Sequence, residues 1–395
     1  MSRIFVTGVG IISAIGNSLN ENHASLLNGK CGISYVNNFP SKYASELPFG
    51  AIQTGNDALK DKLGISNPSV TRTTLLAIHA ANDAVEDAAL TKDELTSADT
   101  AFIGATTVGG MCLTDELYRD ANENYKESPY LSSYDCASVF LYLQEYYHLN
   151  GIIDTINTAC SSSANAIMYG ARLIKNGLAK RAIVGGADSL SKFTINGFNA
   201  LHILSDEVCT PFDEGRKGLN LGEGAAFLVL EKEEDVAGKK IYAEVTGYHN
   251  TSDAFHPSSL SDNGEGPFLS MQGALRSAQL QPNDIDFINA HGTGTENNDE
   301  AESRAMIRIF NTPPPFASTK SNTGHTLGAA GAIESVYSIL SIVNQEIYPG
   351  LHFTKPIQAT GLEPVVVAKQ IPVNHVMSNS FGFGGNCTSL IFSKA

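Results

Sequence analysis

Short apolar runs recur along the chain and alternate with longer stretches in which apolar residues have helical spacing. In the first part of the chain these runs are Ile4–Thr7, Ala101–Gly104, Ile152–Ile156, Ala182–Val184 and Ala225–Leu230. Runs that are apolar throughout, rather than at alternate positions, are typical of strands buried on both faces of a largely parallel sheet. The alternation therefore predicts an α/β fold built from βαβ units.

The strand pattern begins again after a charged stretch, Glu231–Lys240. The later runs are Ile241–Val245, Phe287–Ala290, Phe316–Ser318, Val365–Val367 and His375–Met377. The letters Val-Thr-Gly also follow a strand-like run in both parts of the chain. We therefore expect two similar halves, 1–240 and 241–395, with 31–75 and 105–140 as insertions that cover a site or form an oligomer contact.

Charge and cysteine content narrow the function further. The formal net charge of -15 argues against nucleic-acid and anionic-membrane partners, because those surfaces are bound by clustered Lys and Arg side chains. The six cysteines include no C-x-x-C pair, which predicts a reducing compartment and no structural metal. Gly8 and Gly10 interrupt the first apolar run, so we expect the first buried strand of a cytoplasmic protein rather than a membrane span.

A predicted strand-to-helix junction holds Cys160. The run Ile152–Ile156 precedes it, and apolar residues with helical spacing follow from Ala164 to Ile174. Free N–H groups at a helix start favour a thiolate and can hold an oxyanion, which is the environment of a nucleophile. A small buried structural cysteine is the commoner reading of such a residue, and position alone leaves both open.

Two histidines each follow a strand-like run. His291 lies in FINAHGTGTENNDEAE, and His325 lies in FASTKSNTGHTLGAAGAIES together with Lys320. A neutral imidazole can donate a hydrogen bond to an oxygen that gains charge. One histidine would more often be structural, but two in matching positions favour a catalytic role. For Lys320 alone, a solvated surface residue is the commoner reading.

Of two glycine-rich segments, one is a candidate ligand site and the other only partly matches a dinucleotide-binding motif. In NSFGFGGNC, residues 379–387, glycines allow close backbone approach to a ligand, and Phe381 and Phe383 can close an apolar channel, although a plain turn is the simpler reading. In TGVGIISAIG, Ser13 stands where a dinucleotide-binding motif has its third glycine. The chain also lacks the phosphate-binding G-x-x-x-x-G-K-[ST] and the serine hydrolase G-x-S-x-G.

Taken together, the motifs closely resemble the elongating β-ketoacyl-[acyl carrier protein] synthases of the thiolase-fold superfamily. The segments that carry the resemblance are, in family order, VTGVG, TACSSS, GGAD, PFDEGRKGLNLGEGAA, SDAFH, HGTGT, STKSNTGHTLGAAG and NSFGFGG. The resemblance implies two βαβαβαββ halves packed in a five-layered αβαβα arrangement. It also implies a homodimer, or a heterodimer with a related synthase subunit.

The resemblance implies a role for individual residues as well. Cys160 matches the acylated nucleophile, and His291 and His325 match the two histidines that support decarboxylation. Lys320 matches a buried lysine that supports the histidines. Phe383 matches the gating phenylalanine whose N–H joins that of Cys160 in the oxyanion hole.

A further acidic residue, Glu302, resembles one that contacts the lysine region. The chain departs from the fatty-acid enzymes after the nucleophile. Residues 161–163 are serines, as in polyketide ketosynthases, and Asn165 stands where many fatty-acid members have histidine. The fatty-acid and the specialised polyketide or aryl-polyene pathways both stay open.

The implied reaction is a decarboxylative condensation of a malonyl carrier protein with an acyl group on Cys160, which needs no metal or redox cofactor. The carrier proteins of this family are acidic, so basic residues are candidates for a docking patch: Arg216, Lys217, Lys60, Lys62 and Arg72. There are three alternatives. A thiolase-type acyltransferase would use a second cysteine such as Cys387, and an initiating synthase would have Asn in place of His325. A non-catalytic chain-length partner typically lacks the nucleophile.

Overall fold

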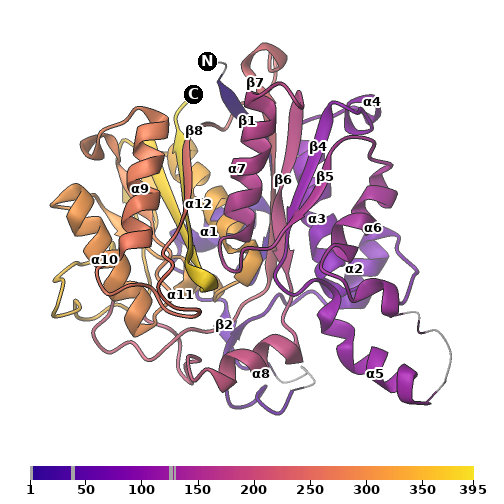
Figure 1. The fold of residues 1–395 in the computed structure, drawn as a ribbon, viewed down its shortest axis with the longest axis horizontal. Coiled ribbons are helices and arrows are strands. Elements are labelled where there is room, and N and C mark those ends of the chain that lie inside the picture. Colours follow the sequence, from indigo (N-terminus) through magenta and orange to yellow (C-terminus); the bar gives the residue numbers. More distant parts are fainter. Residues whose placement is uncertain (1–2, 37–40, 124–127, 129) are drawn as a thin grey trace.

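The computed structural model of the chain describes residues 3–36, 41–123, 128 and 130–395. Within these residues, ten strands form one mixed sheet in the order β10-β9-β13-β14-β8-β1-β7-β6-β4-β5 (Figure 1). The strands of the first part of the chain are β1 (Ile4–Ser13), β4 (Thr100–Ala105), β5 (Ile153–Ile156), β6 (Arg181–Asp188) and β7 (Gly224–Lys232). Those of the second part are β8 (Ala243–Ser252), β9 (Phe287–Asn289), β10 (Phe316–Ala317), β13 (His375–Gly382) and β14 (Asn386–Ser393).

The strand order repeats in the two parts of the sheet. In each part, the strands from the outer edge inward are the third, second, fourth, fifth and first along the chain. The two parts meet where β1 and β8 pair antiparallel through Phe5 with Glu244 and Val6 with Ala243. The expectation of two similar halves agrees with this order, whereas the proposed division into units 1–240 and 241–395 stays a prediction.

The expectation of a largely parallel sheet is wrong. β4 is parallel to β5 and β6, and β9 is parallel to β10 and β13, but the other neighbouring strands of the sheet are antiparallel. A tight hairpin joins β13 to β14, and such a connection can only produce an antiparallel pair. The predicted strand Val365–Val367 is also wrong, because Val365 makes only single backbone hydrogen bonds to Phe316 and Gly350.

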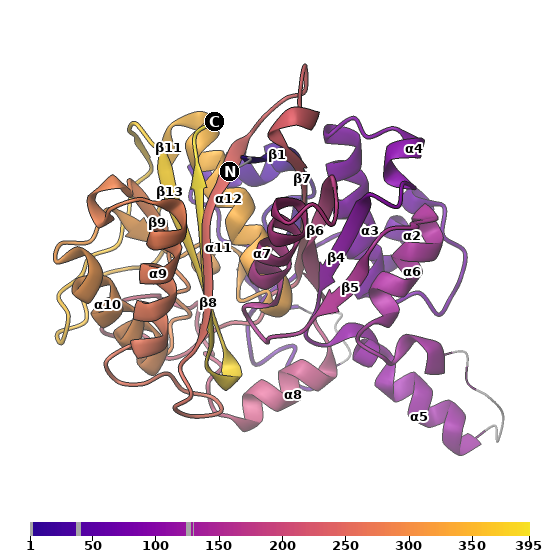
Figure 2. The same cartoon turned by 45° about the horizontal axis from the view of Figure 1, so that its top comes forward.

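Helices cover the outer face of each part of the sheet, and further helices lie between the two parts, as Figures 1 and 2 show. α7 (Ser162–Lys175) and α12 (Ala330–Asn344) pack against each other and against strands of both parts of the sheet. α3 (Arg72–Asp87) covers β1, β6 and β7 from outside, and α9 (Glu265–Ala278) covers β8 and β14 with α10 (Glu296–Phe310) beside it. These are the five layers of the thiolase-like fold.

The other helices lie around this core. They are α1 (Leu19–Leu27), α2 (Asn56–Leu63), α4 (Lys92–Leu95), α5 (Thr114–Glu123), α6 (Ser138–Tyr147), α8 (Lys192–Ala200) and α11 (Lys320–Thr323). Two small sheets pair β2 (Ile33–Ser34) with β3 (Phe49–Gly50) and β11 (Glu346–Ile347) with β12 (Lys369–Gln370). α5, from the expected insertion 105–140, projects from the body of the molecule in Figure 2.

The central helix α12 is buried through most of its length. The segment Leu327–Asn344, which consists of α12 and the short 3-10 turn before it, is long and apolar enough to cross a membrane, yet 89% of it is buried inside the fold. Its buried serines do not leave unsatisfied hydroxyl groups, because Ser335 and Ser338 donate to the carbonyl oxygens of Gly331 and Glu334 one turn earlier. The apolar character of this segment is therefore explained by its place between two layers of strands.

A glycine allows α12 to approach α7 closely. A Cβ atom on Gly331 would lie 2.7 Å from the backbone nitrogen of Ala164 and 2.8 Å from its Cβ atom. The main chain of α7 cannot move away without displacing the strands on which it packs.

We therefore expect Gly331→Ala to lower the free energy of unfolding by about 1–3 kcal/mol, the usual cost of overpacking a dense core. Urea denaturation of the purified chain measures it. The matched control is Gly197→Ala on α8, where a Cβ atom would meet nothing within 4 Å. There alanine should be neutral or stabilising, because it has the higher helix propensity. Equal effects of the two substitutions would contradict this account of the α7–α12 contact.

Candidate active site

Cys160 lies in the turn that joins β5 to α7, as the sequence predicts. The turn is tight, because Ala159 has a φ of 54°, in the left-handed region that residues with a side chain seldom adopt. Ser161 is the N-cap residue of α7, so Cys160 stands just before the helix start. The cysteine is only 5% exposed. The turn thus holds a nearly buried thiol at the end of a central helix.

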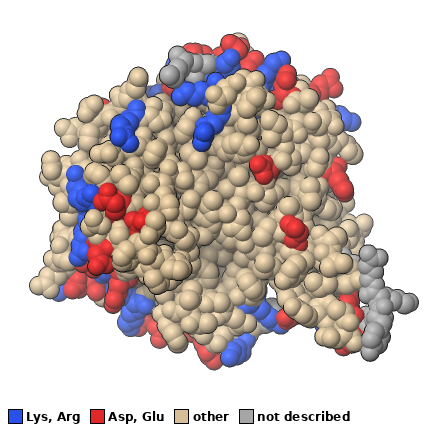
Figure 3. Space-filling model, in the orientation of Figure 1, with Lys and Arg blue, Asp and Glu red and all other residues tan. Residues whose placement is uncertain are grey.

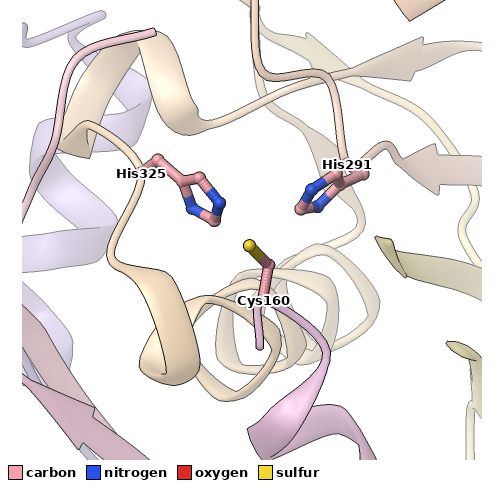
Figure 4. A group of neighbouring side chains, drawn as sticks. All are labelled: Cys160, His291 and His325. Carbon is pink, nitrogen blue, oxygen red and sulfur yellow. The ribbon is translucent and has the colours of Figure 1, made fainter. Parts of the chain in front are cut away.

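Two histidines face this thiol (Figure 4). His291 follows β9, and His325 lies between α11 and α12. Their ring centroids are 5.3 Å apart, and the ring planes are inclined by 85°. The sulfur atom of Cys160 and one ring nitrogen of each of His291 and His325 all lie within 4.8 Å of one another. The residues come from distant parts of the sequence, yet the fold brings all three together.

Lys320 is buried beside the histidines, so the surface reading of this residue is wrong. Its Nζ atom lies 3.2 Å from His291 Nδ1, donates to the His291 carbonyl oxygen at 2.6 Å, and forms an ion pair with Glu334. Because the ammonium group is only a donor, His291 Nδ1 accepts, which leaves the imidazole proton on Nε2. The lysine therefore selects the tautomer of His291.

The carboxylate that pairs with Lys320 is Glu334, whereas Glu302, expected in the lysine region, contacts the His291 loop that Lys320 also contacts. Glu302 accepts hydrogen bonds from the N–H groups of His291 at 2.9 Å and Gly292 at 2.8 Å, and from the Asn379 amide at 3.2 Å. It supports the backbone of the His291 loop instead. Burial raises the pKa of Glu302 and that of Glu334 to about 7.

Both histidines are neutral near pH 7. Burial is the main cause that lowers their pKa values well below the usual one, and the Lys320 charge lowers them further. Neither ring nitrogen of His325 has a hydrogen-bond partner among the described residues. An unpartnered donor in a buried site is available to an oxygen atom of a bound molecule.

The thiol of Cys160 is neutral as well. Burial raises its pKa to about 11, and the Lys320 charge and a hydrogen bond from the backbone N–H of Phe383 oppose that rise. The thiolate-favouring effect that we expect at a helix start is therefore outweighed by burial. The Phe383 ring stacks on Phe198 with centroids 5.7 Å apart and an interplanar angle of 17°.

A cavity of about 500 Å³ leads to these residues. Cys160, His291 and His325 line its inner part. Its other lining residues combine apolar side chains with polar ones, among them Phe198, Leu201, Phe381, Phe383, Thr293 and Asn297. A molecule that combines apolar and polar groups suits such a cavity.

The basic residues expected to form a docking patch do not lie together as one exposed surface. Arg216 is 8% exposed, and its guanidinium group donates to the carbonyl oxygens of Asp213, Thr295 and Glu296. Arg72 is half-buried and pairs with Glu223. Neither guanidinium group is presented on an exposed surface, because each is bound to carbonyl or carboxylate oxygens of the protein.

The remaining three candidates of the patch are lysines. Lys217 is exposed, pairs with Glu207, and lines the cavity. Lys60 is half-buried and Lys62 is exposed on α2. Only Lys217 among them lines the cavity that leads to Cys160.

Sequence reasoning missed Glu334 and Asn386. Glu334 is the one acidic residue in the apolar helix α12, and an acid in such a helix is a signal of a buried partner. Asn386 has no comparable signal, since it is one polar residue in a glycine-rich turn. Among the described residues, the single cluster of possible metal ligands is the group Cys160, His291 and His325, and the Lys320 charge beside it disfavours a cation.

Comparison with known proteins gives a consistent result over the length of the chain. Residues 1–236 match the family model described as "Beta-ketoacyl synthase, N-terminal domain", and residues 242–354 match "Beta-ketoacyl synthase, C-terminal domain". Two similar curated proteins are a putative mitochondrial 3-oxoacyl-[acyl-carrier-protein] synthase of Schizosaccharomyces pombe, which is 33% identical over 100% of this chain and 99% of its own, and 3-oxoacyl-[acyl-carrier-protein] synthase 2 of Staphylococcus aureus, which is 32% identical over 99% and 98%.

Among solved structures, the ishigamide ketosynthase/chain length factor is similar throughout. Its TM-score is 0.92 at 30% sequence identity, and the match covers 100% of this chain and 99% of that chain. The similarity therefore includes the central helices and the loops that carry Cys160, His291 and His325.

The effect of the Lys320 charge on the pKa values of the two histidines should be measurable. In Lys320→Met/Glu334→Gln, which removes both charges and leaves no unpaired buried one, we expect the pKa values of His291 and His325 to rise toward the usual histidine value. NMR titration of imidazole ¹⁵N resonances measures this, with His291→Gln and His325→Gln to assign the signals. In the wild type both rings should stay neutral as the pH falls through 6.5. Identical titrations of wild type and double variant would show that burial alone sets these values.

Proposed function

The chain belongs to the β-ketoacyl synthase family, and from that premise we propose that it is an elongating 3-oxoacyl-[acyl carrier protein] synthase. The observation that carries the proposal is the convergence of Cys160, His291 and His325 within 4.8 Å at the inner end of a cavity. A thiol paired with two neutral imidazoles suits acyl transfer followed by decarboxylation. The contact of Lys320 with the His291 ring supports the same reading.

The first proposed stage transfers an acyl group from a carrier-protein thioester to Cys160. The sulfur attacks the thioester carbonyl carbon, and the oxyanion that forms accepts hydrogen bonds from the N–H groups of Cys160 and Phe383. The bond to the carrier thiol then breaks, and the proton lost by Cys160 leaves with that thiol. The hydrogen bond from the Phe383 N–H to the Cys160 sulfur supports this placement of the oxyanion hole.

The second proposed stage extends the chain. A malonyl thioester enters, and His291 and His325 donate hydrogen bonds to its carbonyl oxygen. Carbon dioxide leaves, the electron pair of the broken carbon–carbon bond forms an enolate, and that carbon attacks the Cys160 thioester. The carbon–sulfur bond breaks, the Cys160 thiolate takes a proton from solvent, and a 3-oxoacyl carrier protein departs. Two neutral donors on a buried oxygen stabilise the enolate without help from a metal or redox cofactor.

The rival functions explain less. A thiolase-type reaction needs a second thiol at the site, but Cys387 is buried between Leu260 and Phe381 and does not line the cavity. A chain-length partner typically lacks the nucleophile, which is present here. An initiating synthase would leave His325 unexplained, because an asparagine takes its place in that class.

We propose acyl carrier protein as the macromolecular partner, with Lys217 at the cavity mouth and Lys60 and Lys62 as candidate contacts. We also propose a second synthase subunit, identical or related, bound beside the edge strand β5. Leu141, Tyr146 and Ile152 are exposed there. Figure 3 shows that the centre of the face that carries α7 has few charged side chains. A cytoplasmic location remains part of the proposal.

The pathway stays open between fatty-acid and polyketide or aryl-polyene synthesis. The three serines after Cys160 are 0% exposed, and their hydroxyl groups bond to the protein: Ser162 to the Ala159 carbonyl oxygen and Ser163 to the Ala332 N–H. They therefore shape the nucleophile turn rather than contact an acyl chain. The curated relatives carry 3-oxoacyl-[acyl-carrier-protein] synthase names, whereas the similar solved structure is a ketosynthase with a chain length factor.

Acylation of one residue tests the first stage. After incubation with a panel of acyl carrier proteins, intact-mass analysis should show one acyl group on the wild type and none on Cys160→Ala. The preferred acyl group would also distinguish saturated from polyene or aromatic substrates. Cys209→Ala serves as the matched control, because Cys209 is a buried thiol that does not line the cavity. Lack of an adduct with every donor would favour the non-catalytic partner.

Separation of the two stages tests the histidines. His325→Ala should still accept an acyl group on Cys160 but should release carbon dioxide from malonyl carrier protein at least about 100-fold more slowly, since a loss of this size follows removal of one oxyanion donor. Labelled carbon dioxide release and intact mass measure the two stages on the same sample. Loss of acylation with decarboxylation intact would contradict the assignment.

A further inference from the structure

A network of amide and hydroxyl groups lies beside Cys160 and has no part in the steps above. Its centre is the Oδ1 atom of Asn386, which accepts hydrogen bonds from Ser161 Oγ at 2.8 Å, Asn165 Nδ2 at 2.9 Å and Asn250 Nδ2 at 2.7 Å. Ser161 and Asn165 belong to the nucleophile turn and α7, whereas Asn250 belongs to β8. One carbonyl oxygen thus joins the Cys160 segment to the second part of the sheet.

Asn165 completes the network in a way that a histidine could not. Its Nδ2 group donates both to Asn386 and to Thr158 Oγ1 at 2.8 Å, and its Oδ1 atom accepts from Thr388 Oγ1 at 2.9 Å. An imidazole offers only two ring nitrogens, so it cannot make all three bonds. Asn165, where this chain departs from the fatty-acid enzymes, therefore binds Asn386 within a network that a histidine could not complete.

Asn386 stands at one end of the turn that carries the Phe383 N–H. It pairs with Gly382 across the β13–β14 hairpin, and Phe383–Gly385 form the tip between them. At the other end, a Cβ atom on Gly382 would lie 2.7 Å from the Thr158 carbonyl oxygen and 3.1 Å from the Cys160 nitrogen. Both ends of the tip are thus held against the nucleophile turn, one by close contact and one by Asn386.

The two glycines of the tip are held by backbone hydrogen bonds, from the Gly384 N–H to the Pro257 carbonyl oxygen and from the Asp253 N–H to the Gly385 carbonyl oxygen, each 2.7 Å, and neither bond involves Phe383 or the nucleophile turn. Gly384 and Gly385 both have a φ of +79°, and glycines widen the range of conformations open to a turn. An oxyanion donor is useful only when its N–H group points at the oxygen before the charge develops. We propose that Asn386 is a positioning residue of this site: through its three accepted hydrogen bonds it holds the hairpin tip so that the Phe383 N–H points at the Cys160 acyl oxygen. The inference rests on the proposed function.

Two substitutions separate the hydrogen bonds of Asn386 from its size. Asn386→Asp keeps an acceptor for all three donors, whereas Asn386→Leu keeps the shape and removes the acceptor. We expect Asn386→Leu to slow acylation of Cys160 by about 10- to 100-fold in single-turnover measurements, mainly through the rate constant rather than the apparent KM, and Asn386→Asp to retain most of the rate. Asn176→Leu, at the far end of α7, is the matched control with an unchanged rate.

A second readout does not depend on acyl transfer. The Phe383 N–H lowers the pKa of Cys160, so Asn386→Leu should shift the pH profile of Cys160 alkylation by iodoacetamide upward, and the control Asn176→Leu should not. If no acyl donor modifies the wild type, the proposed function fails while this profile still tests the inference. Equal rates and profiles in all variants, or equal losses in Asn386→Leu and Asn386→Asp, would overturn it. If Asn386→Leu does not fold, Asn165→Ala must slow acylation, and a wild-type rate there would also overturn it.

Discussion

The buried ion pair between Lys320 and Glu334 is the interaction on which the site depends. The two side chains are 2% and 3% exposed, and removal of one partner from such a pair costs about 3–5 kcal/mol. Glu334 belongs to the central helix α12, and the Lys320 ammonium group also contacts the ring and carbonyl oxygen of His291. The pair therefore joins the core to the histidine loop, and its lysine selects the tautomer of His291 and adds to the effect of burial in lowering the pKa values of both histidines.

The resting site consequently holds little net charge. Cys160 is a neutral thiol, His291 and His325 are neutral imidazoles, and the Lys320 charge is balanced by Glu334. In a buried site, neutral donors that are already oriented interact most strongly with an oxygen only when it becomes negative. The arrangement thus favours the charged species of an acyl transfer or a decarboxylation over the neutral thioester that precedes it.

The sequence predicts this site unevenly, for physical reasons. Cys160, His291 and His325 each follow a strand-like run, and such runs are easy to recognise when they are apolar throughout. β14 was missed because Thr388 and Ser389 interrupt its apolar run, although both hydroxyl groups bond inside the core. Hydrogen bonds between residues more than 200 positions apart, such as those of Asn386 to the nucleophile turn, leave no local pattern. Arg216 was misplaced because nothing in its neighbourhood shows that three carbonyl oxygens surround it.

The distance between thiol and imidazole follows from core packing rather than from loop conformation. Cys160 precedes the N-cap residue of α7, and His325 lies just before the turn that leads into α12, so both central helices begin at the site. The helices are held together where Ser163 Oγ accepts the Ala332 N–H at 2.8 Å and where Gly331 meets Ala164. A shift of one helix along the other would move the sulfur relative to the ring, and dense packing resists such a shift. The two similar parts of the chain therefore have to pack face to face before either reactive group has a partner, which makes the site a property of the whole five-layered fold.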